Sequence, residues 1–410
     1  MTEGSITVTA ALRRSILLLS FATFASMAAQ RICDAMLPEL ARAFSVSLAE
    51  AASVVSVFAV AYGLSQLIYG PLGDRLGKFG VVTCGTLACS GGCLLAVFAG
   101  SLDMLVLARV LTALGAATII PLSMAWIGDE VAYEMRQETL ARVGLGTTLG
   151  IVGGQLFGGL LTDTLGWRWA FGFLAVLFGV VGALLAADWR KHPAAATVPV
   201  TDAAGRPGFV AQAWLILTGP WSRIVLIVAL AEGAAGFGVL AIWASHLNQK
   251  LGLSLTAAGA IVALFGLGGM LYMAAARRMI RRWGERGLVL WGGGLFASMT
   301  GVIGLTPVWW PALPASLLAG FGFFMFHNTM QAHATQMAPG ARGTGVSLFA
   351  SALFLGQSVG VVLAAGFISR IGSSAVIALA ALTFLALAVF FAQAIQRRSR
   401  ARLPGAAPAP

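Results

Sequence analysis

The stretch Gly70-Pro71-Leu72-Gly73-Asp74-Arg75-Leu76-Gly77-Lys78-Phe79-Gly80 separates two long apolar runs, 51–69 and 81–100. So short a polar connection predicts two adjacent antiparallel helices, because loops with unpaired backbone groups are excluded from hydrocarbon. Its glycines let the two backbones approach closely, and its charges can complement the helix ends. The stretch therefore predicts an all-α integral membrane protein, and the rest of the chain can be laid out around it.

The composition supports this class. Of 410 residues, 59% are hydrophobic and 10% are charged, whereas a soluble chain carries roughly 25% charged residues. The net charge of +11 comes from Lys and Arg gathered in a few segments between apolar runs. That distribution is typical of the positive-inside pattern, so we expect a lipid bilayer and no nucleic acid as partner.

Windows of about 20 apolar residues predict twelve transmembrane helices in two six-helix pseudo-symmetric halves. The expected helices are 15–37, 49–71, 80–99, 103–127, 139–162, 168–188, 222–246, 256–276, 287–305, 312–337, 343–368 and 374–396. The expected parts are an N-terminal bundle (1–188), a cytoplasmic linker (189–221), a C-terminal bundle (222–396) and a disordered tail (397–410). Within the linker, 209–217 is apolar enough to lie along the membrane interface.

The basic residues predict the orientation. Twenty lie in one set of connecting segments and termini, and the opposite set holds only Arg42, Arg168, Lys250 and Arg370. The positive-inside rule then places both termini in the cytoplasm, in a multi-pass protein of the inner (plasma) membrane.

The opening stretch resembles the loop 2–3 signature of the major facilitator superfamily. The matching positions are Gly70, Leu72, Asp74, Arg75, Gly77 and Lys78, and Phe79 stands where a second basic residue is usual. The resemblance implies alternating access, with these residues gating the cytoplasmic side. In the outward-open state, we expect Asp74 to face a helix N-terminus, that of the eleventh helix, and Arg75 to pair with Asp129 or Glu130.

Two further stretches resemble the twelve-helix drug/proton antiporters of that superfamily. The run 107–117 is similar to the fourth-helix pattern and includes Arg109. The run 150–159 resembles the fifth-helix antiporter motif, with Gln155 at the proline position. Its glycines are expected to pack helices together, and they are Gly150, Gly154, Gly158 and Gly159.

Ionisable residues inside apolar segments are expensive and usually functional. Asp34, before Pro38, is similar to an acidic residue of the same antiporter family and shares a helix face with Arg31. Arg109 falls at a similar depth, so Asp34–Arg109 and Asp34–Arg31 are both open as ion pairs.

Glu232 lies in the middle of the seventh helix among small residues, which leave room for water or a ligand. His327, Asn328 and Gln331 fall on the tenth helix. We expect Asp34, Glu232 and His327 to couple protons, although interhelical hydrogen bonding is the alternative role for Glu232 and His327. The expected substrate cavity comprises Arg31, Asp34, Arg109, Gln155, Glu232, His327, Asn328 and Gln331.

These features predict a secondary transporter, most simply for proton-coupled export of a small, partly apolar compound. A proton symporter or facilitator for a sugar, amino acid or organic acid is the alternative. The chain carries no metalloprotease, hydrolase or nucleotide-binding motif, so we expect no enzyme, cofactor or metal site. A small-molecule substrate and protons are the expected partners of a monomer.

Overall fold

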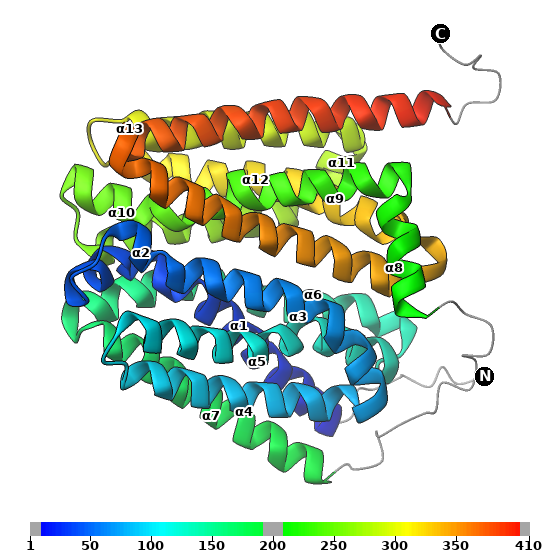
Figure 1. Ribbon diagram of the computed structural model, residues 1–410. Helices are drawn as coiled ribbons and strands as arrows, with labels where there is room; N and C mark the ends of the chain where they lie inside the picture. The colour runs from blue at the N-terminus through cyan, green and yellow to red at the C-terminus, as the bar shows by residue number, and fades with distance from the viewer. Residues whose placement is uncertain (1–9, 192–207, 402–410) are drawn as a thin grey trace, which may run out of the picture.

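The computed structural model describes residues 10–191 and 208–401, which are nearly all helical (Figure 1). The first elements are α1 (Ala10–Ala43), α2 (Leu48–Ala51), α3 (Ser53–Leu76), α4 (Lys78–Val97), α5 (Leu102–Glu130), α6 (Tyr133–Thr164) and α7 (Trp167–Lys191). The second group comprises α8 (Phe209–Thr218), α9 (Pro220–Glu232), the π-helix η2 (Gly233–Gly238), α10 (Val239–Leu251), α11 (Leu255–Leu305), α12 (Ala312–Gln336), the 3₁₀ turn η3 (Pro339–Ala341) and α13 (Arg342–Ala401).

Two of the helices contain a single residue with non-helical backbone angles. Gly284 in α11 has φ 59° and ψ −179°, and Gly372 in α13 has φ 80° and ψ 155°. Glycine adopts positive φ without a steric penalty, so one residue can redirect the chain. The sequence predicted loops between separate helices here, but helix continues on both sides of each glycine, and Figure 1 shows α13 running out and back.

Within the described ranges, nine helices or helix runs are long and apolar enough to cross a membrane. α12 has sufficient length but falls outside this group. Its second half carries His327 and Asn328, which make it more polar than the other long helices. The helix predicted over 312–337 is therefore present, and its polarity sets it apart.

Buried apolar side chains form two clusters. One lies mainly among α1 and α3–α7, and the other mainly among α9–α13. A few residues belong to the cluster of the other group, such as Met27 and Ala35 of α1 and Ala241 of α10. The two helix groups therefore meet along a packed seam.

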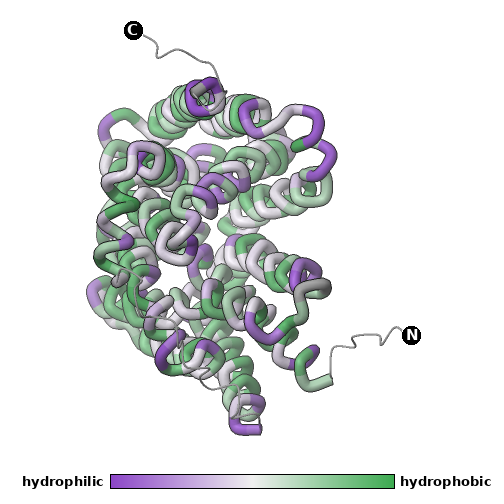
Figure 2. Tube along the Cα trace, turned by 90° about the vertical axis from the view of Figure 1, so that its right-hand side faces the viewer, coloured by the Kyte–Doolittle hydropathy of each residue, from purple (hydrophilic) through white to green (hydrophobic). Residues whose placement is uncertain are grey.

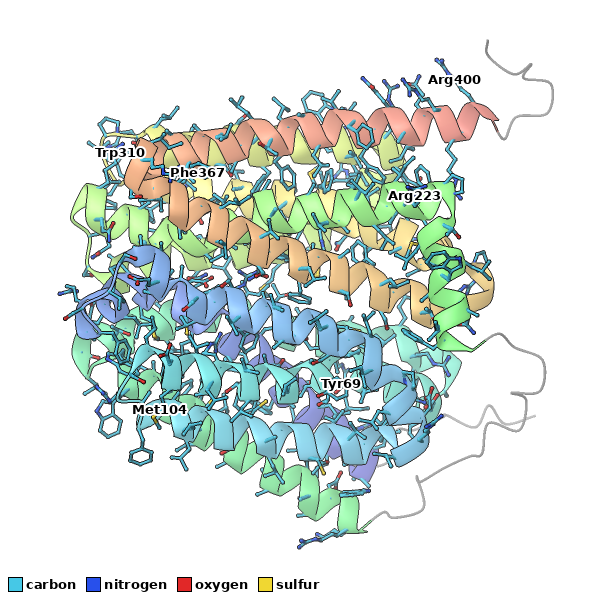
Figure 3. The ribbon with its side chains drawn as sticks, in the orientation of Figure 1. Tyr69, Met104, Arg223, Trp310, Phe367 and Arg400 are labelled. Atoms are coloured by element: carbon cyan, nitrogen blue, oxygen red, sulfur yellow. The ribbon has the colours of Figure 1, made fainter. Side chains whose placement is uncertain are left out.

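Most basic side chains of the described residues lie toward one end of the molecule, which we call the basic end and define by Arg75, Lys78, Arg223 and Arg400. Arg223 and Arg400 lie there in Figure 3, and Met104 and Trp310 lie at the opposite end. Figure 2 views the helices nearly end on, and hydrophilic residues concentrate in the turns. α1 begins and α13 ends at the basic end (Figure 1).

The interfacial piece predicted over 209–217 corresponds to α8, which crosses the basic end roughly perpendicular to the long helices (Figure 1). Its Val210 and Trp214 are 80% and 67% exposed. Residues 192–207 of the predicted linker and 402–410 of the predicted tail lie outside the described residues.

Hydrogen bonds join the two helix groups in the middle of the molecule and at the end opposite the basic end. At the opposite end, the Asp163 carboxylate of α6 accepts from the backbone N–H and the hydroxyl of Thr256, at 2.6 and 2.7 Å. Nearer the middle, the Ser351 hydroxyl of α13 donates to the Gly63 carbonyl of α3 over 2.6 Å. The groups are thus fastened together away from the basic end.

Candidate functional site

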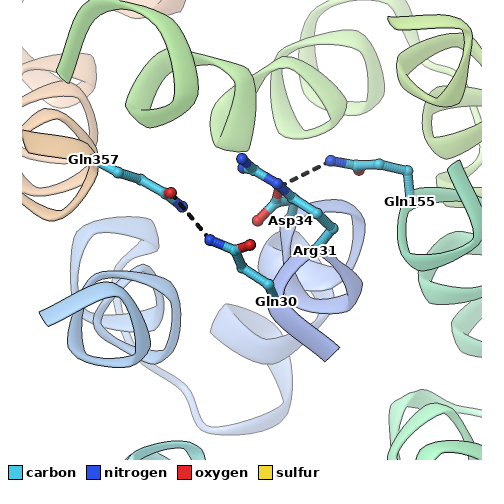
Figure 4. Close-up of polar contacts among 5 residues, drawn as sticks. All are labelled: Gln30, Arg31, Asp34, Gln155 and Gln357. Atoms are coloured by element: carbon cyan, nitrogen blue, oxygen red, sulfur yellow. Dashed lines mark hydrogen bonds and ion pairs between the residues drawn. The ribbon is translucent and has the colours of Figure 1, made fainter. Parts of the chain in front are cut away.

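Asp34 and Arg31 lie one turn apart on α1, and both side chains are fully buried. Arg31 Nη1 lies 3.5 Å from Asp34 Oδ2. The same oxygen accepts a 2.8 Å hydrogen bond from Gln155 Nε2 of α6 (Figure 4). Of the two ion pairs that the sequence left open for Asp34, the structure contains the one with Arg31.

Arg109 of α5 is also buried, but it does not pair with Asp34. Its Nη1 donates to the Ala29 carbonyl over 2.7 Å and its Nε donates to the Val54 carbonyl over 3.1 Å. The guanidinium carbon lies 4.0 Å from the centre of the Phe58 ring. Arg109 therefore ties the backbones of α1 and α3 to α5, and backbone carbonyls take the place of the carboxylate.

The glycines of the predicted antiporter motif place Gln155 beside Asp34. A Cβ atom at Gly154 would lie 2.7 Å from the Ala28 carbonyl oxygen and 2.9 Å from the Cβ of Arg31. Cβ atoms at Gly150 and Gly158 would also overlap α1. Such close approach of two membrane helices is typical of small residues at their interface. Gly159 differs, because it abuts the first residues of α11.

A second pair of titratable side chains lies between α9 and α12. Glu232 is the last residue of α9 and is fully buried, and His327 of α12 is 14% exposed. His327 Nδ1 lies 2.8 Å from Glu232 Oε1. The sequence proposed both residues for proton coupling, but it did not predict that they contact each other.

The other predicted residues of α12 are not part of this pair. Asn328 is half-buried and Gln331 is exposed. Neither side chain makes a hydrogen bond to any residue within 10–191 or 208–401. The structure brings together Arg31, Asp34 and Gln155 in one place and Glu232 and His327 in another.

One polar contact was missed by the sequence analysis. Gln30 Nε2 of α1 donates to Gln357 Oε1 of α13 over 3.3 Å, and both side chains are buried (Figure 4). This hydrogen bond joins the two helix groups beside Arg31. The available signal was an amide side chain within an apolar run.

Several buried polar atoms at this seam have no hydrogen-bond partner in the described parts of the chain. They are Gln30 Oε1, Arg31 Nε and Nη2, Asp34 Oδ1, Gln155 Oε1, Glu232 Oε2 and Gln357 Nε2. A buried polar group without a partner costs about 1–3 kcal/mol. The seam therefore combines donors and acceptors that could be satisfied by water, by a proton or by a polar ligand in another arrangement of the helices.

At the basic end, the turn between α3 and α4 is held by Lys78. Its Nζ lies 3.0 Å from Asp74 Oδ1 and 2.7 Å from Asp129 Oδ2 at the end of α5. The pairing of Arg75 with Asp129 or Glu130, predicted for the outward-open state, is absent from the described structure, in which Lys78 reaches Asp129. Gly77, with φ 87°, makes the turn that brings Lys78 to this position.

Asp74 is 52% exposed, and no helix N-terminus among the described residues binds its carboxylate. The predicted contact with the eleventh helix, at the start of α13, is therefore absent from this arrangement. This is consistent with the two helix groups being fastened at the opposite end.

Comparison with known protein families gives one match over nearly the whole chain. The family described as Major Facilitator Superfamily matches residues 19–361 and 225–409. The chain is 22% identical over 252 residues to the uncharacterized MFS-type transporter YwfA of Bacillus subtilis (strain 168), covering 62% of this chain and 60% of YwfA. It is 27% identical over 344 residues to the multidrug resistance protein B homolog of Mycobacterium tuberculosis (strain CDC 1551 / Oshkosh), covering 71% of this chain and 64% of that protein. The chain thus spans less than two thirds of each relative.

Solved structures with the same fold cover almost the entire chain. A bacterial homolog of the human lysosomal transporter Spinster, in an inward-facing and unoccupied conformation, gives a TM-score of 0.75 at 18% identity. The alignment covers 98% of this chain and 100% of that chain. A peptide transporter, POT, gives a TM-score of 0.74 at 15% identity, covering 93% of this chain and 94% of the other. At these identities the likeness establishes the fold alone.

Proposed function

Because the chain belongs to the Major Facilitator Superfamily, we propose that it is a secondary active transporter that exports a small, partly apolar compound in exchange for protons. We assign the N-terminal half to 1–188 and the C-terminal half to 222–396, with 189–221 as linker and 397–410 as tail. The separate core clusters of α1–α7 and α9–α13 support this division.

The proposed protein crosses the membrane twelve times. The nine apolar helix runs become eleven crossings when α11 and α13 are each divided at the glycine that redirects them. α12 supplies the twelfth, because 25 residues at 1.5 Å per residue exceed the roughly 30 Å hydrocarbon core. Its His327 then faces the interior of the bundle, where it contacts Glu232.

The basic end faces the cytoplasm in this proposal, as the positive-inside rule requires. Alternating access then has a simple structural basis, because the Asp163–Thr256 and Gln30–Gln357 contacts close the outer side. Substrate would approach the seam from the cytoplasm in this arrangement. It would leave after the outer contacts break and the halves rock to the opposite tilt.

The observation that carries proton coupling is the 2.8 Å contact between His327 and Glu232. A fully buried carboxylate is expensive in a membrane unless it is protonated or paired. His327 can both donate and accept a proton through its ring nitrogens, so it gives the carboxyl group a partner for proton exchange. Coupling requires only that the two access states bind this proton with different affinities.

Asp34 would act as a second proton-coupling site. A proton on its carboxylate would compete with the ion pair to Arg31 and with the hydrogen bond from Gln155. Glu232 ranks first, because its partner is a histidine, which can both donate and accept a proton, whereas the partner of Asp34 is an arginine, which can only donate. The names of the multidrug resistance protein B homologs among the relatives support export. Proton-driven uptake or facilitated diffusion of a sugar, amino acid or organic acid is the second candidate, since its proton site would be the same.

The Lys78 cluster is proposed as part of the gate. Lys78 joins α4 to Asp74 and Asp129 at the basic end, so it keeps the inner ends of α3, α4 and α5 moving as one body. When the inner side closes, Asp74 would be free to cap a helix of the other half, because a helix N-terminus favours an anion.

A flux assay in proteoliposomes tests the function. Purified protein is reconstituted with an acidic lumen, and candidate drugs and metabolites are screened for accumulation against their own gradient. Exchange predicts uptake into the acidic lumen, symport predicts the opposite direction, and a facilitator shows no dependence on the pH gradient. The expected result is exchange.

The E232Q variant connects this assay to the site. Glutamine keeps the shape and can still hydrogen-bond to His327 but cannot release a proton, so downhill flux should remain while gradient-driven accumulation falls by at least about tenfold. The E138Q variant is the matched control, because Glu138 is 65% exposed and pairs only with Arg142. Wild-type accumulation by E232Q would assign Glu232 a structural role.

A further inference from the structure

The segment that directly follows Glu232 is a π-helix. η2 comprises Gly233–Gly238 and lies between α9 and α10 within one continuous helical run. π-helical turns are rare and occur frequently at functional sites. Its one large side chain is Phe237, whose ring is 7% exposed.

Phe237 contacts both ionisable pairs. The guanidinium carbon of Arg31 lies 4.4 Å from the centre of the Phe237 ring, which is the geometry of a cation–π interaction. On its other side, the ring centre is 6.2 Å from that of His327 and 4.7 Å from that of Phe323. His327 in turn stacks on Phe323 with 10° between the ring planes.

We propose that Phe237 is a positioning residue that transmits the protonation state of the Glu232–His327 pair to Arg31, across the seam between the two helix groups. The inference rests on the proposed function, because it assumes that this pair exchanges protons. It adds a specific route by which the proton in one half changes the contacts of the other half.

The proposed route from Glu232 to Phe237 is short, because both residues lie in one continuous stretch of backbone. Glu232 immediately precedes η2, so a movement of Glu232 toward or away from His327 pulls directly on the π turn. Conversion of a π turn to an α turn changes the helical register by one residue, which is about 100° of rotation at 3.6 residues per turn. Such a rotation would remove the Phe237 ring from Arg31 and leave its guanidinium with Asp34 alone.

The charged and titratable groups that surround this route are few. Arg31 and Asp34 face it from α1, Glu232 from α9, His327 from α12 and Arg109 from α5. The described parts of α3, α6, α11 and α13 carry their charges near their ends or at the turns of α11 and α13. The pH response of the seam should therefore depend on these five residues.

The test measures conformation and protonation separately and needs no substrate. Spin labels at T164C and Q249C, two exposed positions at the outer ends of α6 and α10, report the distance between the halves. The C84S background removes the one exposed native cysteine among the described residues. Infrared difference spectra of the same samples in lipid nanodiscs follow carboxyl protonation from about pH 5 to about pH 9.

The wild type should change its ratio of short to long distances as the Glu232 carboxyl band titrates, and E232Q should lose both signals. In F237L the carboxyl titration should be unchanged, but the ratio of short to long distances should respond to pH at least about tenfold less. The reason is that leucine fills the space without offering a π face to Arg31. F237Y should restore the response to within about twofold of the wild type.

F324L is the matched control, because Phe324 packs against His327 at 6.2 Å between ring centres but makes no cation–π contact with Arg31. If F237L follows pH as the wild type does, or if F324L loses the response equally, Phe237 does not transmit the signal. If the wild-type distances do not respond to pH, the proposed proton coupling and the role of Phe237 are both refuted. A response that E232Q abolishes and F237L preserves refutes only the role of Phe237.

Discussion

Each charge of the Arg31–Asp34 pair should cost more stability when it is removed alone than when it is removed together with its partner. R31M leaves the buried Asp34 carboxylate with Gln155 as its remaining partner. D34N leaves a buried guanidinium beside a neutral amide and the face of Phe237, with no opposite charge. The double variant R31M/D34N leaves neither charge in the seam.

The magnitude follows from the geometry. Two charges 3.5 Å apart attract each other by about 5 kcal/mol at an effective dielectric constant of about 20. Loss of one partner from a buried pair typically costs about 3–5 kcal/mol, whereas replacement of both is often close to neutral. We expect each single variant to lose about 3 kcal/mol of unfolding free energy and the double variant about 1 kcal/mol or less. The coupling energy is then about 5 kcal/mol, in line with the attraction between the two charges.

The assay is unfolding in mixed dodecylmaltoside and dodecylsulfate micelles, followed by tryptophan fluorescence across a range of detergent ratios. The exposed Arg142–Glu138 pair serves as the control cycle, with an expected coupling of about 0.5 kcal/mol or less. If the losses of R31M and D34N add up in the double variant to within about 0.5 kcal/mol, the two charges do not stabilise each other.

Two further variants test the packing and the gate. G154A should cost about 1–3 kcal/mol in the same unfolding assay, because its Cβ would lie 2.7 Å from the Ala28 carbonyl oxygen. G144A, on the same helix with open space around it, should be neutral or stabilising by up to about 1 kcal/mol. D74N should express normally and bind detergent micelles as the wild type does, but its flux in proteoliposomes should fall several-fold. Wild-type flux by D74N would remove Asp74 from the gate.

The positions of most helices could be predicted from the sequence because membrane-length apolar windows leave few alternatives. The two redirecting turns could not. Around Gly284 the chain is rich in arginine, which by composition predicts a polar loop. Whether a chain loops or continues as helix depends there on one backbone angle that glycine permits and composition does not record.

The ionisable residues of the candidate site could be singled out from the sequence, since such groups are rare in apolar helices, whereas the amides Gln30 and Gln357 were missed. The partners of the ionisable residues could not be predicted. Arg109 and Arg31 both fall at the depth of Asp34, and the helix face that Arg31 shares with Asp34 does not exclude a partner from another helix. The choice between them depends on the rotation of each helix about its axis, which is set by packing contacts such as those of Gly154 against α1. Arg109 instead reaches two backbone carbonyls, a type of partner with no sequence signature.

The π-helix shows the same dependence on tertiary contacts. A run such as Gly233–Gly238 has weak local preference, so its conformation is decided by what it packs against. A Cβ atom at Gly233 would overlap the backbone of Leu353, and one at Gly238 would lie 2.8 Å from the Cα of Gly360, so both glycines press directly on α13. These contacts fix η2 against α13, and η2 in turn fixes the Phe237 ring against Arg31. A tilt of α13 would therefore release the π turn and the cation–π contact together, because the conformation of this segment depends on its packing against α13 as well as on its sequence.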